Sequence, residues 1–447
     1  MKSLQQFHLN LKSDDLFIGQ VCFYIGITFL VSALPISSFF LIISLIISFK
    51  KHKYTFLKDK WNYPLFFVSG LMIFSCLYNT LTSYQQEIIP NIKTLIWVDL
   101  FNWIPLFLSF WGFQIYLKTK SQRMIFSKLL LIGGIPFILS CISQYLLKFY
   151  GPFKTFWGLV VWYQKPLIGL SGVTGLFSNP NYAGYWLTIL LPFIIAFAQK
   201  EKSYLNKLLI SLYLILDIYF LLATNSRNAF FGLLLSFLTL FKIKFILTFI
   251  IAILLIFLFL IFIYPQVLSF FDLLLYTNNY GIDTTNTLIN KLSEFKPSNI
   301  FKTQRFQIWQ KSYELISKKP FFGWGAVTFA FFYNNQDGLW NIQHPHNIII
   351  HLAYSYGLIV SIILLAFISI LFIKAYRNVF LENQKSNFDY MEKAFVVSCL
   401  ISITYHISDI IIYDGKINLI IWIFLACLKC INDEHEFTKN SIFKVKK

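Results

Sequence analysis

Charged side chains are scarce in this chain. Only 13% of its 447 residues are Asp, Glu, Lys or Arg, about half of the share in soluble globular proteins. Hydrophobic residues make up 57%, and the mean hydropathy is +0.63. Several stretches reach the length of about 18 mainly apolar residues that crosses a bilayer as a helix. The composition therefore excludes a soluble globular protein and predicts a polytopic membrane protein.

Cysteine is also scarce, with six residues that all fall in or beside apolar segments. Cys427 and Cys430 form a C-x-x-C sequence, but neither a second pair nor a nearby histidine completes a metal site. We interpret them as ordinary residues of membrane helices and predict no disulfide framework. A cleavable signal peptide is not evident, because the polar N-terminus leads into a long first span and further spans follow.

Arginine is rarer still. Of the 38 Lys and Arg residues only four are arginine, namely Arg123, Arg227, Arg305 and Arg377. Where charge alone suffices the chain uses lysine, so an arginine indicates a position that needs a planar fork of donors. The alternative is a codon bias toward A/T-rich triplets, which the abundance of Phe, Ile, Lys, Asn and Tyr also fits. The net charge of +18 is not interpreted as nucleic-acid binding, because in a membrane protein the placement of lysines reports topology.

Hydropathy predicts twelve membrane spans. With a cytoplasmic N-terminus, 25 Lys and Arg residues fall inside, six fall in short outer connections, and seven fall in one long outer segment that the charge rule discounts. This bias predicts that both termini are cytoplasmic. The expected spans are 16–34, 36–49, 62–81, 95–117, 129–148, 182–198, 208–223, 229–241, 245–264, 347–373, 394–412 and 417–430.

The long outer segment covers residues 265–346. Within it, aromatic and aliphatic residues recur at steps of three and four from Phe306 to Ile316, which predicts an amphipathic helix. Pro320 is expected to end that helix, and the glycines of "FFGWGAVTF" permit a tight turn. A second outer loop, residues 149–181, is rich in Trp and Phe and is expected to lie along the membrane interface.

Several scarce polar residues fall on the same predicted outer face. Arg227 lies in the hairpin between the seventh and eighth spans, and Arg305 begins the loop helix. His344 and His346 close the long loop. Each has a simpler interpretation, as an arginine that reaches lipid headgroups, a solvated residue on an amphipathic helix, or a histidine at a helix cap. Their common face favours a shared site over separate coincidences.

Four further polar residues lie within the predicted spans. His406 and Asp409 are three residues apart on one helix face, near the outer end of the eleventh span, and are expected to pair with each other. Asp99 and Asp217 are isolated ionisable residues in the fourth and seventh spans, and they receive no role.

Four motifs follow one another within residues 175–373: "GLFSNPNYAGYWLTILLPF" (175–193), "TNSRNAFFGLLLSF" (224–237), "RFQIW" with "KKPFFGWG" (305–325) and "HPHNIIIHLAYSYGL" (344–358). In order and spacing they resemble the O-antigen ligase and polymerase superfamily of bacterial envelope glycosyltransferases, which includes protein O-oligosaccharyltransferases. The ligase pattern of His-Asn, nine residues and Gly falls on His346, Asn347 and Gly357. Val360 replaces its final small or tyrosine residue, so ligase and polymerase both stay open.

The resemblance implies an all-α, GT-C-like membrane fold with about twelve transmembrane helices and one large extracytoplasmic loop containing amphipathic helices. Residues 1–174 are expected to form N-terminal transmembrane helices. Residues 175–373 are expected to form the O-antigen ligase-like core, and residues 374–447 the C-terminal helices and a cytoplasmic tail.

The resemblance also implies a reaction. A glycan would pass from a polyprenyl-diphosphate carrier to a hydroxyl of lipid A core, another glycan or a protein, on the periplasmic face of the bacterial plasma membrane. The leaving diphosphate gains negative charge, and a guanidinium fork matches phosphate oxygens two at a time. The outer segments contain no D-x-D pair for a metal, so Arg227 and Arg305 are expected to hold the diphosphate without metal or cofactor.

An acceptor hydroxyl must also lose a proton as it attacks. An imidazole, with a reference pKa of about 6.5, suits that task, and His346 is the expected base. His344 is the second candidate and otherwise a substrate-binding residue. The other expected substrate-binding residues are Asn179, Asn181, Asn347 and Trp309. For Asn179 and Asn181 the alternative is a turn built on Pro180.

The main alternative function is membrane transport, since twelve spans with cytoplasmic termini are a common transporter plan. Related cyanobacterial proteins have been discussed as bicarbonate-accumulation factors, so uptake of inorganic carbon is its specific form. Transporters usually show related halves and interrupted helices near the midplane, and the sequence indicates neither. A scaffolding membrane subunit is a third class, but it leaves the shared outer face unexplained.

Overall fold

A computed structural model describes residues 14–82, 92–168, 171–240, 304–334, 342–381 and 390–445. Almost all regular structure in this part of the chain is helical, and eight of its helices are long and apolar enough to cross a membrane. The chain is therefore an all-α polytopic membrane protein. The expected span 245–264 and most of the expected outer loop 265–346 lie outside the described residues.

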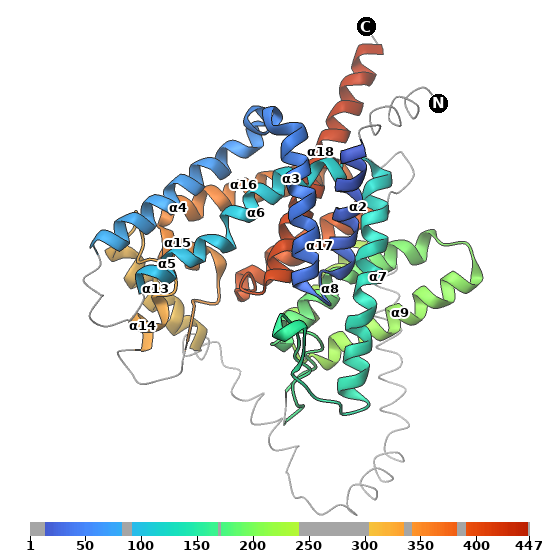
Figure 1. Ribbon diagram of the computed structural model, residues 1–447, viewed down its shortest axis with the longest axis horizontal. Helices are drawn as coiled ribbons and strands as arrows, with labels where there is room; N and C mark the ends of the chain where they lie inside the picture. Colours follow the sequence, from blue (N-terminus) through green and yellow to red (C-terminus); the bar gives the residue numbers. More distant parts are fainter. Residues whose placement is uncertain are drawn as a thin grey trace, which may run out of the picture.

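Six α-helices lie in the described residues between 14 and 145 (Figure 1). α2 and α3 form an antiparallel pair, and α7 begins with a capping box in which Thr119 and Gln122 satisfy each other's backbone amides. The start of α2 lies on the same side of the molecule as the end of the last helix, α18 (Gly415–Val445), which projects beyond the other helices (Figure 1). The six helices are α2 (Asp14–Phe29), α3 (Leu34–Lys58), α4 (Tyr63–Thr82), α5 (Ile92–Val98), α6 (Ile104–Gly112) and α7 (Lys120–Tyr145).

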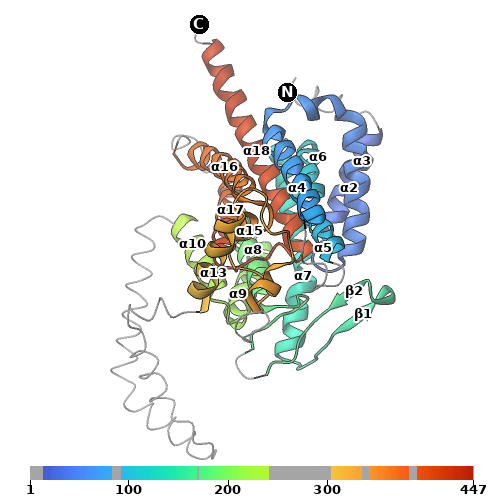
Figure 2. The ribbon, with the colours of Figure 1, turned by 90° about the vertical axis from the view of Figure 1, so that its left-hand side faces the viewer.

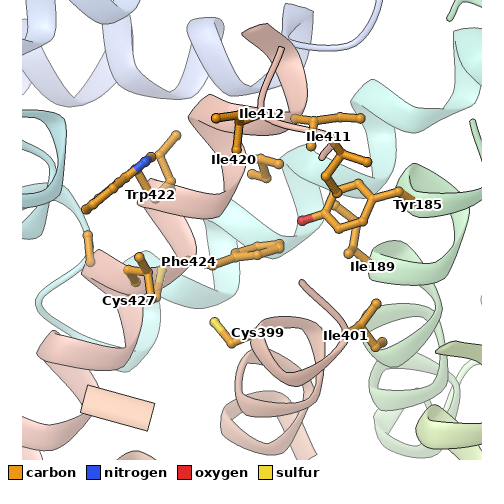
Figure 3. Packing of buried hydrophobic residues seen from close by; sticks show 14 of the residues in the cluster. Tyr185, Ile189, Cys399, Ile401, Ile411, Ile412, Ile420, Trp422, Phe424 and Cys427 are labelled. Carbon is orange, nitrogen blue, oxygen red and sulfur yellow. The ribbon is translucent and has the colours of Figure 1, made fainter. Parts of the chain in front are cut away.

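The helices from residue 180 onward supply the centre of the molecule. α17 packs against α8, α10 and α18, and apolar side chains fill the space between them. Figure 3 shows this core, where Tyr185, Cys399 and Phe424 approach one another from α8, α17 and α18. These helices are α8 (Pro180–Lys200), α9 (Tyr204–Ala223), α10 (Arg227–Leu240), α13 (Gln304–Lys318), α14 (Phe329–Asn334), α15 (Ile348–Tyr356), α16 (Leu358–Tyr376) and α17 (Tyr390–Ser408), followed by α18.

Two expected spans are interrupted, so the expectation of unbroken helices was wrong. The span expected at 95–117 consists of α5, a 3-10 turn at Asp99–Asn102 and α6. The span expected at 347–373 is divided at Gly357 into α15 and α16. Gly357 has φ +100°, and a Cβ there would lie 2.0 Å from the Phe321 carbonyl oxygen, so only glycine fits. Hydropathy did not reveal either break, because apolar residues flank both.

The two interruptions contact each other. The Tyr356 hydroxyl, at the end of α15, donates a hydrogen bond of 2.6 Å to Asp99 Oδ2. Asp99 Oδ1 accepts from the Asn102 side chain at 2.9 Å. Asp99, which the sequence left without a role, therefore stabilises two non-helical segments inside the membrane protein, where unpaired backbone and polar groups are costly.

The second outer loop contains a short antiparallel hairpin of β1 (Phe153–Thr155) and β2 (Val160–Trp162), which the all-α expectation did not include. It lies at the end of the molecule opposite the end of α18 (Figure 2). Trp157 at its tip is 99% exposed. The Trp162 indole N–H donates to the Ser32 carbonyl oxygen at 2.8 Å and so attaches the hairpin to the segment between α2 and α3.

The amphipathic helix expected from Phe306 to Ile316 is confirmed as α13. Ile308 and Leu315 on its apolar face pack into a small separate core with Phe329 and Tyr354. Pro320 follows the helix end. The expected tight turn is confirmed by the positive φ angles of Gly323 (+62°) and Gly325 (+87°), whose segment pairs with the end of α15 through Trp324 N–H and the Tyr354 carbonyl oxygen (2.8 Å).

Candidate functional site

The His346 imidazole is paired with a buried carboxylate. His346 Nδ1 lies 2.9 Å from Asp409 Oδ1. The Asp409 side chain is 9% exposed, whereas that of His346 is 33% exposed. With the proton on Nδ1, this bond leaves Nε2 of His346 as an acceptor on the more open side of the ring. An imidazole oriented in this way by a carboxylate is a suitable proton acceptor for a hydroxyl.

The backbone conformation at His346 places its side chain beside Asp409. Its φ is +53°, in the left-handed region, which histidine enters more readily than most residues. The following residue, Asn347, caps α15, because its Oδ1 accepts from the amides of Ile349 and Ile350. Asn347 Nδ2 donates to the Ile407 carbonyl oxygen at 2.9 Å, near the end of α17. Both ends of the Asn347 side chain thus hold the His346 loop against α17.

The second oxygen of Asp409 is held by the first turn of α8. Asn181 Nδ2 donates to Asp409 Oδ2 at 3.0 Å. Asn179 Oδ1 accepts from the Asn181 backbone amide at 2.7 Å and caps α8. Of the two asparagines expected to bind substrate, Asn179 therefore shapes the helix start and Asn181 positions Asp409.

His344 lies beside His346, with ring centroids 4.5 Å apart. Its ring is stacked on that of Tyr413 at 5.8 Å, and its Nδ1 is buried without a hydrogen-bond partner in the described part of the chain. Burial, together with the neighbouring His346 and His351, lowers the pKa of His344 to about 4. At neutral pH His344 is therefore an uncharged neighbour of His346.

Trp309 reaches the site from α13, the helix that also carries Arg305. The Trp309 indole N–H donates to the Pro345 carbonyl oxygen at 2.9 Å, between the two histidines. Arg305 precedes Trp309 by four residues and so shares its helix face, one turn nearer the start of α13. Among the described residues the Arg305 side chain forms no hydrogen bond or ion pair, so its donors are unused within this part of the molecule.

Arg227 begins α10 and is exposed. The start of α10 lies against the first turns of α8, since a Cβ on Gly184 would lie 2.8 Å from the Ala229 side chain. Arg227 is thus at the same end of the bundle as Asn181. No hydrogen bond or ion pair joins Arg227 to any residue that the structure describes, nor does one join Arg227 or Arg305 to His346.

Three of these side chains also have the arrangement of a metal site. One ligand atom each from His344, His346 and Asp409 lies within 4.8 Å of the other two. Two imidazoles and a carboxylate are a common ligand set for zinc. A metal bound through His346 Nδ1 and Asp409 Oδ1 would replace the hydrogen bond that these two atoms share.

The sequence missed the partner of His346. Helix spacing paired Asp409 with His406, but that interpretation was wrong, because His406 Nδ1 bonds the Ser402 carbonyl oxygen at 2.7 Å. Asp409 follows the last residue of α17, and its oxygens are taken by His346, Asn181 and the Ile410 amide. Spacing along one helix identifies neighbours within that helix, whereas this pair joins residues 63 apart.

A family comparison bears on these residues. The family model described as O-Antigen ligase matches residues 212–365. The match begins in α9, ends in α16 and contains Arg227, Arg305 and His346. The matched segment is about a third of the 447-residue chain and is similar to the O-antigen ligase family. The resemblance to the O-antigen ligase and polymerase superfamily is thereby confirmed, and with it a multi-pass membrane protein of the glycosyltransferase type. No curated protein matches the chain.

The segment that matches the family model does not contain the whole candidate site. Asn181 precedes the matched residues, and Asp409 follows them. His346 inside the matched segment is therefore positioned by helices on both sides of it, α8 and α17. A site built from these separate segments requires the complete helical bundle.

Proposed function

We propose that this protein transfers a glycan from a polyprenyl-diphosphate carrier to an acceptor hydroxyl, on the periplasmic face of the bacterial plasma membrane. The observation that carries this proposal is the 2.9 Å pair between His346, inside the segment that matches the family model, and Asp409, which follows that segment. The family match supports the glycosyltransferase class, and the carrier, the acceptor and the membrane face belong to the proposal.

His346 acts as the general base. Asp409 holds the proton on Nδ1, so Nε2 accepts the proton of the acceptor hydroxyl while its oxygen attacks the anomeric carbon of the donor glycan. The bond from that carbon to the diphosphate oxygen breaks, and the leaving polyprenyl diphosphate takes the bonding electrons. His344, neutral beside His346, adds no positive charge that would oppose protonation of the base.

Arg227 and Arg305 hold the leaving diphosphate. Both side chains lie at the first turn of a helix and form no ion pair among the described residues, which leaves their donors available to a ligand. A guanidinium offers paired donors to phosphate oxygens, and the start of a helix also favours an anion. Preorganised donors of this kind stabilise charge that develops during the reaction, without a metal ion.

The family match favours glycan transfer over the transport alternative. Interrupted helices are common in transporters, and two are present here. The two breaks contact each other through the Tyr356–Asp99 hydrogen bond, so these polar groups already have partners within the protein.

Gene deletion and complementation test the proposal. We expect the deletion strain to lose a glycan product, wild-type chain to restore it, and His346→Ala to fail despite normal membrane abundance. His52→Ala, on the half-buried histidine of α3, is the matched control and should complement fully. Unchanged envelope polysaccharide and glycoproteins in the deletion strain would contradict the function.

The same experiment separates the three acceptor types when the products are resolved on a gel. Loss of long chains from an intact lipid A core indicates ligation, and single-repeat products indicate polymerisation. Loss of a glycosylated protein with normal polysaccharide indicates transfer to protein.

A further inference from the structure

Basic side chains line a cavity at the other end of the helices that carry the candidate site. The cavity has a volume of about 420 Å³ and lies between the start of α7, the end of α8 and the start of α17. Its charged lining consists of four cations and one carboxylate, namely Lys120, Arg123, Lys128, Lys200 and Glu392. This excess of positive charge indicates an anionic ligand.

Two of the four cations are already paired. Arg123 Nη2 and Lys120 Nζ each lie 3.4 Å from the same Glu392 oxygen. Arg123 is fully buried and also donates to the carbonyl oxygens of Leu117 and Lys118 and to Glu434, so it is a structural residue of the cavity wall. The carboxylate is therefore used within the protein.

Unlike Lys120 and Arg123, Lys128 and Lys200 are not paired with Glu392. Both are exposed, and neither forms an ion pair with another residue in the described ranges. They approach the cavity from α7 and α8, so their two charges face one volume from separate helices. The neighbouring acid, Glu201, accepts hydrogen bonds from the backbone amides of Lys202 and Ser203, and it interacts with Lys128 through charge without forming an ion pair.

The remaining wall of the cavity is apolar. It consists of Met124 and Ile125 on α7 and Met391 and Phe395 on α17, alongside the polar Ser121. Phe395 lies one helical turn beyond Met391, deeper in the bundle. A ligand with an anionic head and a hydrocarbon body fits this combination better than a fully hydrated anion, because the apolar side chains offer nothing to a hydrated ion.

The position of the cavity agrees with a bilayer surface. Along α8, Lys200 is 19 residues beyond Asn181, a rise of roughly 30 Å, which is close to the hydrocarbon thickness of a membrane. Figure 1 shows the start of α7 at the same side of the molecule as the end of α18. The cavity and the His346–Asp409 pair are thus separated by about one bilayer.

We infer that this cavity binds the phosphate headgroup of an anionic glycerophospholipid. Lys128 and Lys200 contact the phosphate, and Met391 and Phe395 contact the upper part of an acyl chain. Basic pockets between transmembrane helices bind such headgroups by charge and by exclusion of water. The lipid would join α7, α8 and α17 at the surface opposite the candidate site. This inference is independent of the proposed glycan transfer.

Native mass spectrometry of the purified full chain tests the inference, with phosphatidylglycerol, phosphatidylcholine and inorganic phosphate as separate probes. We expect one retained phosphatidylglycerol per chain. The double variant Lys128→Gln/Lys200→Gln should bind it about 30-fold more weakly, from roughly fivefold per basic side chain. Lys200→Glu should weaken binding further, and unchanged thermal unfolding will verify that each variant is folded.

The matched control is Lys58→Gln/Lys207→Gln, which removes two exposed lysines outside the cavity lining. We expect its affinity to stay within about twofold of wild type, given that surface lysines outside the site contribute little. Equal losses in the two double variants, or equal retention of phosphatidylcholine, would overturn the inference. Displacement of the lipid by millimolar inorganic phosphate would assign the site to free phosphate and overturn the lipid assignment.

Discussion

Asn181 and Asp409 are 228 residues apart in the chain, yet their side chains share a hydrogen bond of 3.0 Å. The bond joins the first turn of α8 to the residue after the end of α17, and it leaves the other Asp409 oxygen free to orient His346. The Asn181 amide therefore holds one oxygen of the Asp409 carboxylate, and the other oxygen is hydrogen-bonded to the His346 imidazole. The five predictions below concern this assembly and the backbone that supports it.

Asp409→Asn should reduce glycan transfer by about 100-fold or more, since a correctly oriented general base typically contributes 10²–10⁴ in rate. An asparagine amide can donate to Nδ1 as well as accept from it, so His346 would no longer be held in one tautomer. The measurement is the rate of transfer per folded protein in membranes. Asp433→Asn, at an exposed carboxylate of α18, should retain normal activity. A fully active Asp409→Asn would remove the carboxylate from the mechanism.

Arg227→Lys should lower transfer by about 10²–10³-fold, the usual loss for one preorganised donor, although the charge is kept. Lysine presents a single point charge in place of the paired donors of guanidinium. Arg305→Lys should behave similarly. Arg377→Lys is the matched control, because Arg377 is exposed near the end of α16 and lies outside the site. Near-normal transfer by Arg227→Lys would exclude it from diphosphate binding.

Chelation should leave activity unchanged. The proposed mechanism assigns the diphosphate to arginines, and Asp409 already occupies His346 Nδ1. The assay is transfer by purified protein in lipid vesicles before and after EDTA treatment, with metal content measured in parallel. Strict dependence on a divalent ion would instead support a metal held by His344, His346 and Asp409, whose ligand atoms lie within 4.8 Å of one another.

Acidification should destabilise the protein through His344. Its pKa falls to about 4 in the folded protein, against about 6.5 for an unfolded chain, so the unfolded state binds the additional proton between these values. Stability contributed by neutral His344 is therefore complete above about pH 6.5 and is lost as the pH falls toward 4, by up to about 3 kcal/mol.

Thermal unfolding of wild type and His344→Asn between pH 4 and pH 7 measures this effect. The variant should lose much of the pH dependence in that window. An identical pH profile for both proteins would show that a group other than His344 causes the acid sensitivity.

Gly357→Ala should destabilise the protein by about 2 kcal/mol or more, because alanine at φ +100° is strained and its Cβ would lie 2.0 Å from the Phe321 carbonyl oxygen. Gly70→Ala is the matched control. A Cβ at Gly70, within α4, meets no atom within 4 Å, so this change should be neutral or stabilising by up to about 1 kcal/mol. Chemical unfolding in detergent measures both. Equal stabilities would contradict the assigned turn.

The arginines illustrate the limits of interpretation by residue type. Scarcity indicated that each arginine serves as a fork of donors, and Arg123 does so, but within the protein, where it joins α7 to α17 and α18. Its role required knowledge of Glu392 and Glu434, which are more than 260 residues away in the chain. The composition identifies arginine as a scarce side chain with many hydrogen-bond donors. Only the tertiary structure shows which groups accept from those donors.

The sequence by itself determined the membrane class, most helix positions, the amphipathic α13 and the family, because hydropathy, periodicity and local motifs are properties of short segments. It also identified His346, Arg227 and Arg305 as candidates. Only the tertiary structure decided that Asp409 orients His346, that Asn347 and Asn179 act as helix caps, and that α5–α6 and α15–α16 are broken spans joined by Tyr356 and Asp99. Hydrogen bonds between distant segments depend on which helices pack together. The hydropathy of a single helix does not report its packing partners.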